Sequence, residues 1–197
     1  MDSWCNILDE DKLKLNVNFA AMFVLNFECL KDYIVSQIRN LYLDSIHFEE
    51  GKIIYKESKQ YKEQVRTLDK NIENASLKWF IQEGAITQDD FEIYQKIRKR
   101  RNDIIHEFLK NLDEGFSDND GMLFNKMLTI YAKIDKWWIN EIEIPTSVEE
   151  VPVDYDRDDV CGGQAIVLSI INSIILENKG NEYKEVLAQI MKARNKK

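Results

Sequence analysis

An arginine, an asparagine and a histidine lie close together in the chain, at Arg101, Asn102 and His106. The guanidinium of arginine offers a planar fork of donors to phosphate oxygens. Histidine titrates near neutral pH and can move protons to and from a reacting oxygen. This set of residue types suits phosphodiester chemistry.

The three residues end the densest basic run of the sequence. Five of the six residues from Lys96 to Arg101 are cationic, in a chain whose formal net charge is −8. An acidic chain argues against a broad nucleic-acid-binding surface, so any such contact must be local. The run is the candidate for that contact, and the competing interpretation is a solvated helix face.

The run lies on a helix that the sequence predicts over residues 88–112. Thr87 is a suitable N-cap, and the acidic residues that follow it suit the first turn of a helix. Apolar residues then recur at intervals of three and four, which marks one buried stripe. The residues of that stripe are Phe91, Tyr94, Ile97, Ile104, Ile105, Phe108 and Leu112.

The same spacing sets the directions of the two reactive side chains. Arg101 falls in the middle of the apolar stripe, where an arginine is costly unless it meets a carboxylate of another helix or a phosphate. His106 is five residues further on, which turns it by about 140° around the helix axis. One helix therefore does not bring Arg101 and His106 to a single point, but both can line a groove beside it.

The pattern Arg101-Asn102-x-x-x-His106 resembles the arginine–histidine motif of the HEPN superfamily, in which a polar residue such as Asn often follows the arginine. The resemblance extends from near Ser76 to Phe108. It includes a helix that ends at Gly84, an Ile-Thr start to the next helix, and a long helix that carries the motif.

HEPN proteins are small helical bundles, commonly dimers, and many are metal-independent endoribonucleases of toxin–antitoxin, phage-defence and RNA-processing systems. The resemblance implies that Arg101 and His106 are catalytic and that Asn102 supports them. It implies cleavage of RNA to a 2′,3′-cyclic phosphate and a 5′-hydroxyl, without metal or cofactor. We then expect Arg98, Lys99 and Arg100 to contact the RNA backbone.

The resemblance also implies a homodimer and leaves room for an antitoxin or regulatory protein as partner. Some HEPN relatives are non-catalytic binding or regulatory modules. In that alternative, Arg101 and His106 pair with carboxylates at a dimer interface. Toxins silenced by nucleotide transfer carry a Tyr two residues after the histidine, whereas this chain has Phe108, so that mode of silencing is not expected here.

Composition favours a folded helical protein. Hydrophobic residues make up 44% of the chain, and only seven Gly and two Pro interrupt it. The three cysteines, Cys5, Cys29 and Cys161, are widely separated, which argues against a zinc site and for a reducing, cytoplasmic compartment. The apolar runs are short and interrupted, so we expect a soluble protein without a membrane span.

We expect an all-α, up-and-down bundle of about five to seven helices in a single domain over residues 1–197, with room for one small β-hairpin at 46–55. An acidic loop at 143–160 and a C-terminal helical pair at 162–197 complete it. Trp137 and Trp138 are expected in the core or at a dimer contact, the alternative being a base-stacking platform. The expected helices cover residues 9–43, 58–69, 71–83, 88–112, 122–142, 164–178 and 181–194, with a polar connection at 116–121.

Overall fold

The computed structural model of the 197-residue chain describes residues 4–49, 51–148, 151, 154–177, 179–180 and 183–184, with the backbone alone for 52–55. The expected all-α bundle with a small hairpin is confirmed. The longer helices are α2 (Glu10–Leu41), α4 (Ile72–Gln82), α5 (Gln88–His106), α7 (Asp118–Trp138) and α9 (Gly163–Leu176). The shorter elements are α1 (Cys5–Leu8), β1 (Leu43–Glu49), β2 (Lys52–Glu57), α3 (Lys59–Tyr61), η1 (Lys62–Arg66), α6 (Phe108–Glu114), η2 (Ile139–Glu143) and α8 (Ile144–Thr146).

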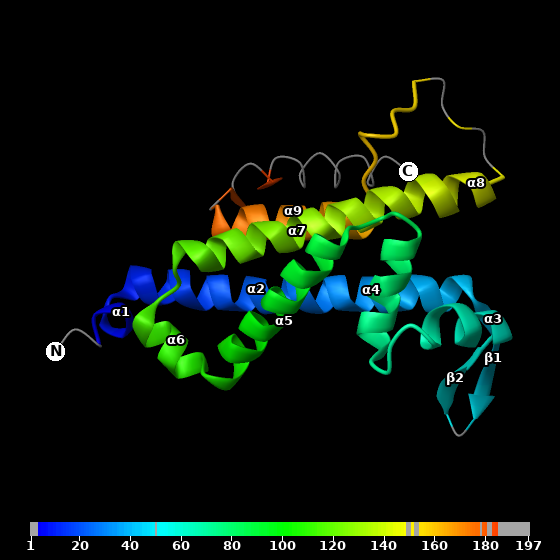
Figure 1. Cartoon of the computed structure of the whole chain (residues 1–197). Coiled ribbons are helices and arrows are strands. Elements are labelled where there is room, and N and C mark those ends of the chain that lie inside the picture. Colours follow the sequence, from blue (N-terminus) through cyan, green and yellow to red (C-terminus); the bar gives the residue numbers. More distant parts are fainter. Residues whose placement is uncertain are drawn as a thin grey trace.

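The long helix α2 is the spine of the bundle. Asp9 caps it, because its side chain accepts the backbone N–H groups of Asp11 and Lys12. α7 and α9 run along α2, while α4 and α5 cross it (Figure 1). By length and composition α2 is apolar enough to cross a membrane, but a core helix passes the same test. Its apolar stripe packs against the other helices, at Ala20, Phe23, Phe27, Leu30, Ile34 and Ile38.

An aromatic cluster fills the end of the bundle where α4 meets α7. The rings of Trp137 and Trp138 contact Phe80 edge to face, at centroid distances of 5.9 and 6.3 Å. Trp137 also meets Trp79 at 5.9 Å. Trp138 is buried and Trp137 is partly buried, so the expectation that this pair packs in the core is confirmed.

The β-hairpin projects from the same end of the bundle (Figure 1). β1 and β2 pair antiparallel, with Ile46 opposite Tyr55, and the pairing extends beyond the expected 46–55 at both ends. Gly51 in the turn has φ of 75°, a left-handed conformation that glycine adopts without strain. His47 is exposed on β1, as expected, and its ring nitrogen lies 2.9 Å from Ser45 Oγ.

The expected single helix over 88–112 is wrong, because the chain bends at Glu107 (φ −117°, ψ 37°). The side-chain amide of Asn111 supports the bend by donating to Asp103 O at 3.2 Å and to Glu107 O at 2.8 Å. The same two carbonyls also accept the backbone N–H groups of Glu107 and Asn111. α5 therefore ends at His106, and α6 leaves in a new direction (Figure 1).

Three other expected boundaries are also wrong. α7 begins at Asp118 inside the expected polar connection, because Ser117 caps it, and the helical path continues through η2 and α8 to Thr146. The expected loop at 143–160 is therefore shorter, and Tyr155 and Arg157 bind it back to η2 through Asn140 and Glu141. The expected helix 58–69 is a short α3 followed by the π-helical turn η1. Most of the expected helix 181–194 lies outside the described residues.

Candidate functional site

The helix that carries the motif is fixed at its start by a capping box. Thr87 Oγ1 accepts the backbone N–H of Asp90 at 3.2 Å, and Asp90 Oδ2 accepts the backbone N–H of Thr87 at 3.0 Å. Thr87 is thus the N-cap that the sequence predicts. The start of α7 repeats the arrangement with Ser117 and Asp120, at 3.4 and 2.8 Å.

Each capping carboxylate is also bound by a cation from the other helix. Lys133 Nζ on α7 lies 2.8 Å from both oxygens of Asp90 on α5. Arg100 Nε on α5 lies 2.6 Å from Asp120 Oδ1 on α7. We call Asp90–Lys133 and Asp120–Arg100 the reciprocal cap pairs. These two ion pairs link α5 to α7 at two places.

The reciprocal cap pairs change the acidity of both aspartates. Burial by itself would raise the pKa of Asp90, but the Lys133 ammonium and the two Thr87 donors lower it below its usual value of 3.8. Burial opposes the shift at Asp120 too, and Arg100 with the Ser117 donors lowers the pKa of that carboxyl. Both carboxylates are therefore more stable as anions in the folded chain than in the unfolded chain.

Arg101 points from α5 onto the spine helix α2. Its Nη2 forms an ion pair with Glu28, and its Cζ lies 5.5 Å from the centroid of the Phe27 ring. Its Nη1 donates to Asn102 Oδ1 at 3.0 Å. The arginine in the apolar stripe thus has the anionic partner that its position demands, and that partner is a carboxylate of the same chain.

Part of the Arg101 guanidinium is less well satisfied. Its side chain is 23% exposed, and its Nε is buried without a hydrogen-bond partner among the described residues. Glu28 is shared, because Lys31 on the next turn of α2 also pairs with it. If Arg101 moved toward a phosphate, Lys31 would still neutralise Glu28, which lowers the cost of that exchange.

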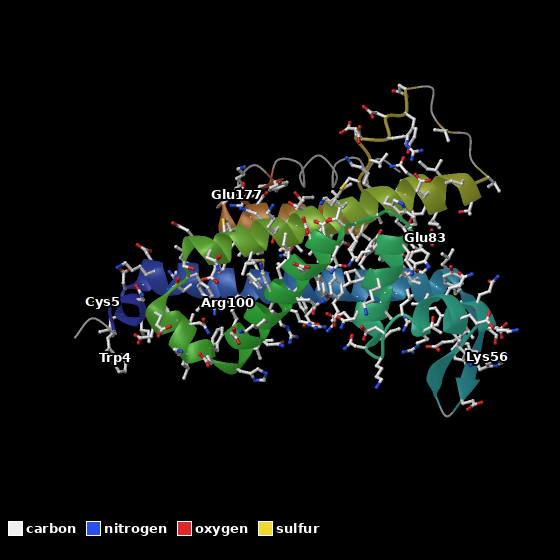
Figure 2. All side chains as sticks on the ribbon, viewed as in Figure 1. Trp4, Cys5, Lys56, Glu83, Arg100 and Glu177 are labelled. Atoms are coloured by element: carbon white, nitrogen blue, oxygen red, sulfur yellow. The ribbon has the colours of Figure 1, made fainter. Side chains whose placement is uncertain are left out.

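The other two arginines of the basic run also bind across helices. Arg98 Nη1 lies 3.5 Å from Glu73 Oε1 and 3.1 Å from Asn74 Oδ1, both on α4. Arg100, labelled in Figure 2, binds Asp120 on α7. The run thus connects α5 to three neighbours, with Arg98 facing α4, Arg100 facing α7 and Arg101 facing α2. Lys99 is exposed.

His106 is the last residue of α5 and is exposed. No described residue forms a hydrogen bond or an ion pair with its ring. Apolar side chains surround the bend that follows it, where Ile105 is 41%, Phe108 is 40% and Leu109 is 76% exposed. We call Ile105, Phe108 and Leu109 the elbow patch.

Within one chain, the motif residues do not converge on a compact site. Arg101 and Asn102 contact each other, and Arg101 is held against α2. His106 stands at the end of α5, exposed beside the elbow patch. A pocket near the bend is lined by four acidic residues and two basic ones, and Asp103, Glu107 and Glu114 are among the acidic ones. No group of three or more His, Cys, Asp or Glu in the described part of the chain is arranged to hold a metal ion.

Comparisons with protein-family models, with curated proteins and with solved structures find no match to this chain. The resemblance to HEPN proteins therefore rests on the motif residues and their helical setting.

Sequence reasoning missed the two carboxylates that organise this region. Asp120 had a local signal, because Ser117-x-x-Asp120 has the spacing of a capping box. The local signal for Glu28 was weaker. Glu28 directly follows Phe27, so it lies at the edge of the apolar stripe of α2. A charged residue at such an edge needs a partner, but the sequence does not say that the partner is Arg101.

Proposed function

We propose that the protein is a metal-independent endoribonuclease of HEPN type that acts as a homodimer in the cytoplasm. The observation that carries the proposal is the placement of His106, exposed at the end of the motif helix and bordered by the elbow patch. A second copy packed on that patch would remove the exposed apolar groups from water and bring two motif helices together. A site built from two copies overcomes the divergence of Arg101 and His106 on a single helix.

The chemistry is the attack of a ribose 2′-oxygen on the adjacent phosphorus. The new bond closes a 2′,3′-cyclic phosphate while the bond to the 5′-oxygen breaks. One His106 accepts the proton of the 2′-hydroxyl, and the His106 of the other copy donates a proton to the departing 5′-oxygen. Arg101 donates hydrogen bonds to the phosphate oxygens that gain charge, and Asn102 holds the guanidinium in place.

RNA binding in this proposal requires an exchange of partners. Arg101 leaves the carboxylate of Glu28 for a phosphate, while Lys31 remains on Glu28. Lys99 is an exposed cation of the run, as is Lys96, and it contacts the backbone without such an exchange. Arg98 and Arg100 reach RNA only by giving up Glu73 and Asp120, so we assign them the weaker contributions.

A second candidate function is a non-catalytic binding or regulatory subunit. The observation that favours it is the set of internal ion pairs, since Arg98, Arg100 and Arg101 each have a carboxylate partner from another helix. In that role the arginines hold the bundle together, and the elbow patch binds a second copy or a regulatory protein such as an antitoxin.

Incubation of labelled RNA with the purified protein in EDTA distinguishes the two candidates. The nuclease proposal expects cleavage products with cyclic phosphate ends from RNA and none from DNA, which lacks the 2′-hydroxyl. His106→Ala removes the cleavage, and His47→Ala is the matched control, because His47 is the other histidine and is exposed on the hairpin. Activity that requires added Mg²⁺, or that survives in His106→Ala, refutes the nuclease assignment.

A further inference from the structure

A pocket of about 300 Å³ lies between α7 and α9 and reaches Asn26 of α2. Its walls are mainly apolar and include Met127 and Leu128 of α7 and Leu168 of α9. No residue of α5 lines it, so it is separate from the proposed nuclease site. Its volume is at the lower end of the range of about 300–1,000 Å³ that is usual for small-molecule sites.

A buried hydroxyl without a partner lines this pocket. Tyr131 is 5% exposed, and its Oη has no hydrogen-bond partner among the described residues. Its ring packs on the ring of Tyr33 at a centroid distance of 5.1 Å, which fixes its position. Because a buried polar group without a partner is costly, a ligand donor that reached Tyr131 Oη would remove that cost.

A buried carboxylate lines the same pocket. Asp135 is 3% exposed, and its two oxygens accept one hydrogen bond each from neutral donors. Tyr33 Oη donates to Oδ1 at 2.9 Å, and the backbone N–H of Gly162, the N-cap of α9, donates to Oδ2 at 2.7 Å. No described Lys, Arg or His forms an ion pair with Asp135.

The two groups together define the chemistry of the ligand. A buried carboxylate that has only neutral donors gains most from a cation. The nearby cation Lys136 lines the pocket but pairs with Asp158 at 3.6 Å instead. Glu177, at the end of α9 (Figure 2), also lines the pocket, but Lys179 pairs with it at 2.6 Å. Asp135 is therefore the acidic residue of the lining that has no cationic partner among the described residues.

We propose that this pocket binds a small primary amine with an apolar body. The ammonium group donates hydrogen bonds to Asp135 and to Tyr131 Oη, and the apolar body packs on Met127, Leu128 and Leu168. This inference is independent of the nuclease proposal, because the two sites share no residue.

Binding of 2-phenylethylamine measured by calorimetry tests the proposal. Its neutral counterpart is 2-phenylethanol and its anionic counterpart is 3-phenylpropionate, which have a similar body and a different head group. We expect the amine to bind one site per chain with a Kd of about 1 mM or tighter. The alcohol should bind at least about tenfold more weakly, and the carboxylate should show no binding.

Two variants with matched controls locate the site. Tyr131→Phe removes only the hydroxyl and should weaken amine binding by about three- to tenfold. Tyr94→Phe is its control, because Tyr94 Oη is also buried without a described partner but does not line this pocket. Ser169→Trp should block the pocket from an exposed position, whereas Val167→Trp, exposed on the same helix and outside the lining, should bind normally.

Alkylation of the free cysteines gives a second measurement. Cys161 lines the pocket and is exposed, and Cys5 is exposed on α1. Saturating 2-phenylethylamine should slow the alkylation of Cys161 and leave the rate at Cys5 unchanged. Equal affinity for the three probes, or wild-type affinity in both Tyr131→Phe and Ser169→Trp, overturns the proposal. No binding of the amine at 10 mM, on the order of ten times the expected Kd, overturns it as well.

Discussion

Asp120→Asn should destabilise the protein substantially, because this aspartate serves two helices at once. It accepts the backbone N–H of Ser117 in the capping box of α7 and binds Arg100 of α5 at 2.6 Å. Asp120 is 4% exposed and the side chain of Arg100 is 22% exposed, so water screens the ion pair between them only partly. The asparagine keeps the shape and one acceptor oxygen but loses the charge.

The magnitude follows from the interactions that the charge supports. A hydrogen bond to a charged group contributes about 1.5–3 kcal/mol, and a negative charge in the first turn contributes about 0.3–1 kcal/mol. The amide oxygen of the asparagine retains part of this stabilisation. We therefore expect the unfolding free energy to fall by about 2–3 kcal/mol at pH 7. Urea denaturation followed by far-ultraviolet circular dichroism measures it as a change in midpoint at a constant slope.

The effect should also depend on pH with a definite sign. The pKa of Asp120 is lowered in the folded chain, so its stabilising contribution is fully present above the unfolded value, near 3.8. The contribution is lost as the pH falls through the lower pKa of the folded state. The difference in unfolding free energy between wild type and Asp120→Asn should therefore be largest near pH 7 and should shrink below about pH 4.

Asp118→Asn is the matched control for this prediction. Asp118 lies in the same first turn of α7 but is exposed, and no described residue forms an ion pair with it. Its substitution should cost less than about 1 kcal/mol, the usual size of an exposed interaction with the helix dipole. Equal losses in the two variants, or a loss at Asp120 that does not change between pH 7 and pH 3, would show that the cap pair is not a major source of stability.

Three other outcomes are expected. Gly162→Ala should lower the unfolding free energy by about 1–3 kcal/mol in urea denaturation, because its Cβ would lie 2.5 Å from Asp135 Oδ1, whereas Gly163→Ala meets nothing within 4 Å and should be neutral. Leu109→Glu should convert a dimer into a monomer of 23.3 kDa in sedimentation, and a wild type that is already monomeric at tens of micromolar (roughly the range of a moderate interface) contradicts the dimer. Glu28→Gln should tighten RNA binding in EDTA by about threefold or more, since it frees the paired guanidinium, and unchanged binding argues that this arginine does not contact RNA.

Local signals in the sequence were sufficient for much of the fold. The threes-and-fours spacing of apolar residues predicted the long helices, and Thr87 predicted the start of α5. The break at Glu107 was missed, because one of its supports is the side chain of Asn111 in α6, which donates to the carbonyls of Asp103 and Glu107. The apolar spacing continues through that break at Phe108 and Leu112, so periodicity alone gives no sign of it.

The candidate site was harder to predict than the fold, because its geometry depends on contacts between helices. The sequence placed Arg101 in an apolar stripe and required an anionic partner, and both statements are confirmed by its contacts with Phe27 and Glu28. It did not choose between a phosphate and a carboxylate as that partner. The identity of the partner depends on which face of α2 packs against α5. The residue pattern of a single helix does not reveal how that helix packs on another.

The interpretation of the basic run changes once the ion-pair partners of its arginines are known. As a string of charges, Lys96 to Arg101 indicates a surface for an anion. In the folded chain its three arginines pair with Glu73, Asp120 and Glu28, which leaves Lys96 and Lys99 as its exposed cations. A chain of net charge −8 with so few exposed cations on its motif helix should bind RNA weakly outside the proposed nuclease site. Such an enzyme would depend on the geometry around His106 in a dimer for recognition, so its activity should be lost when the dimer is disrupted.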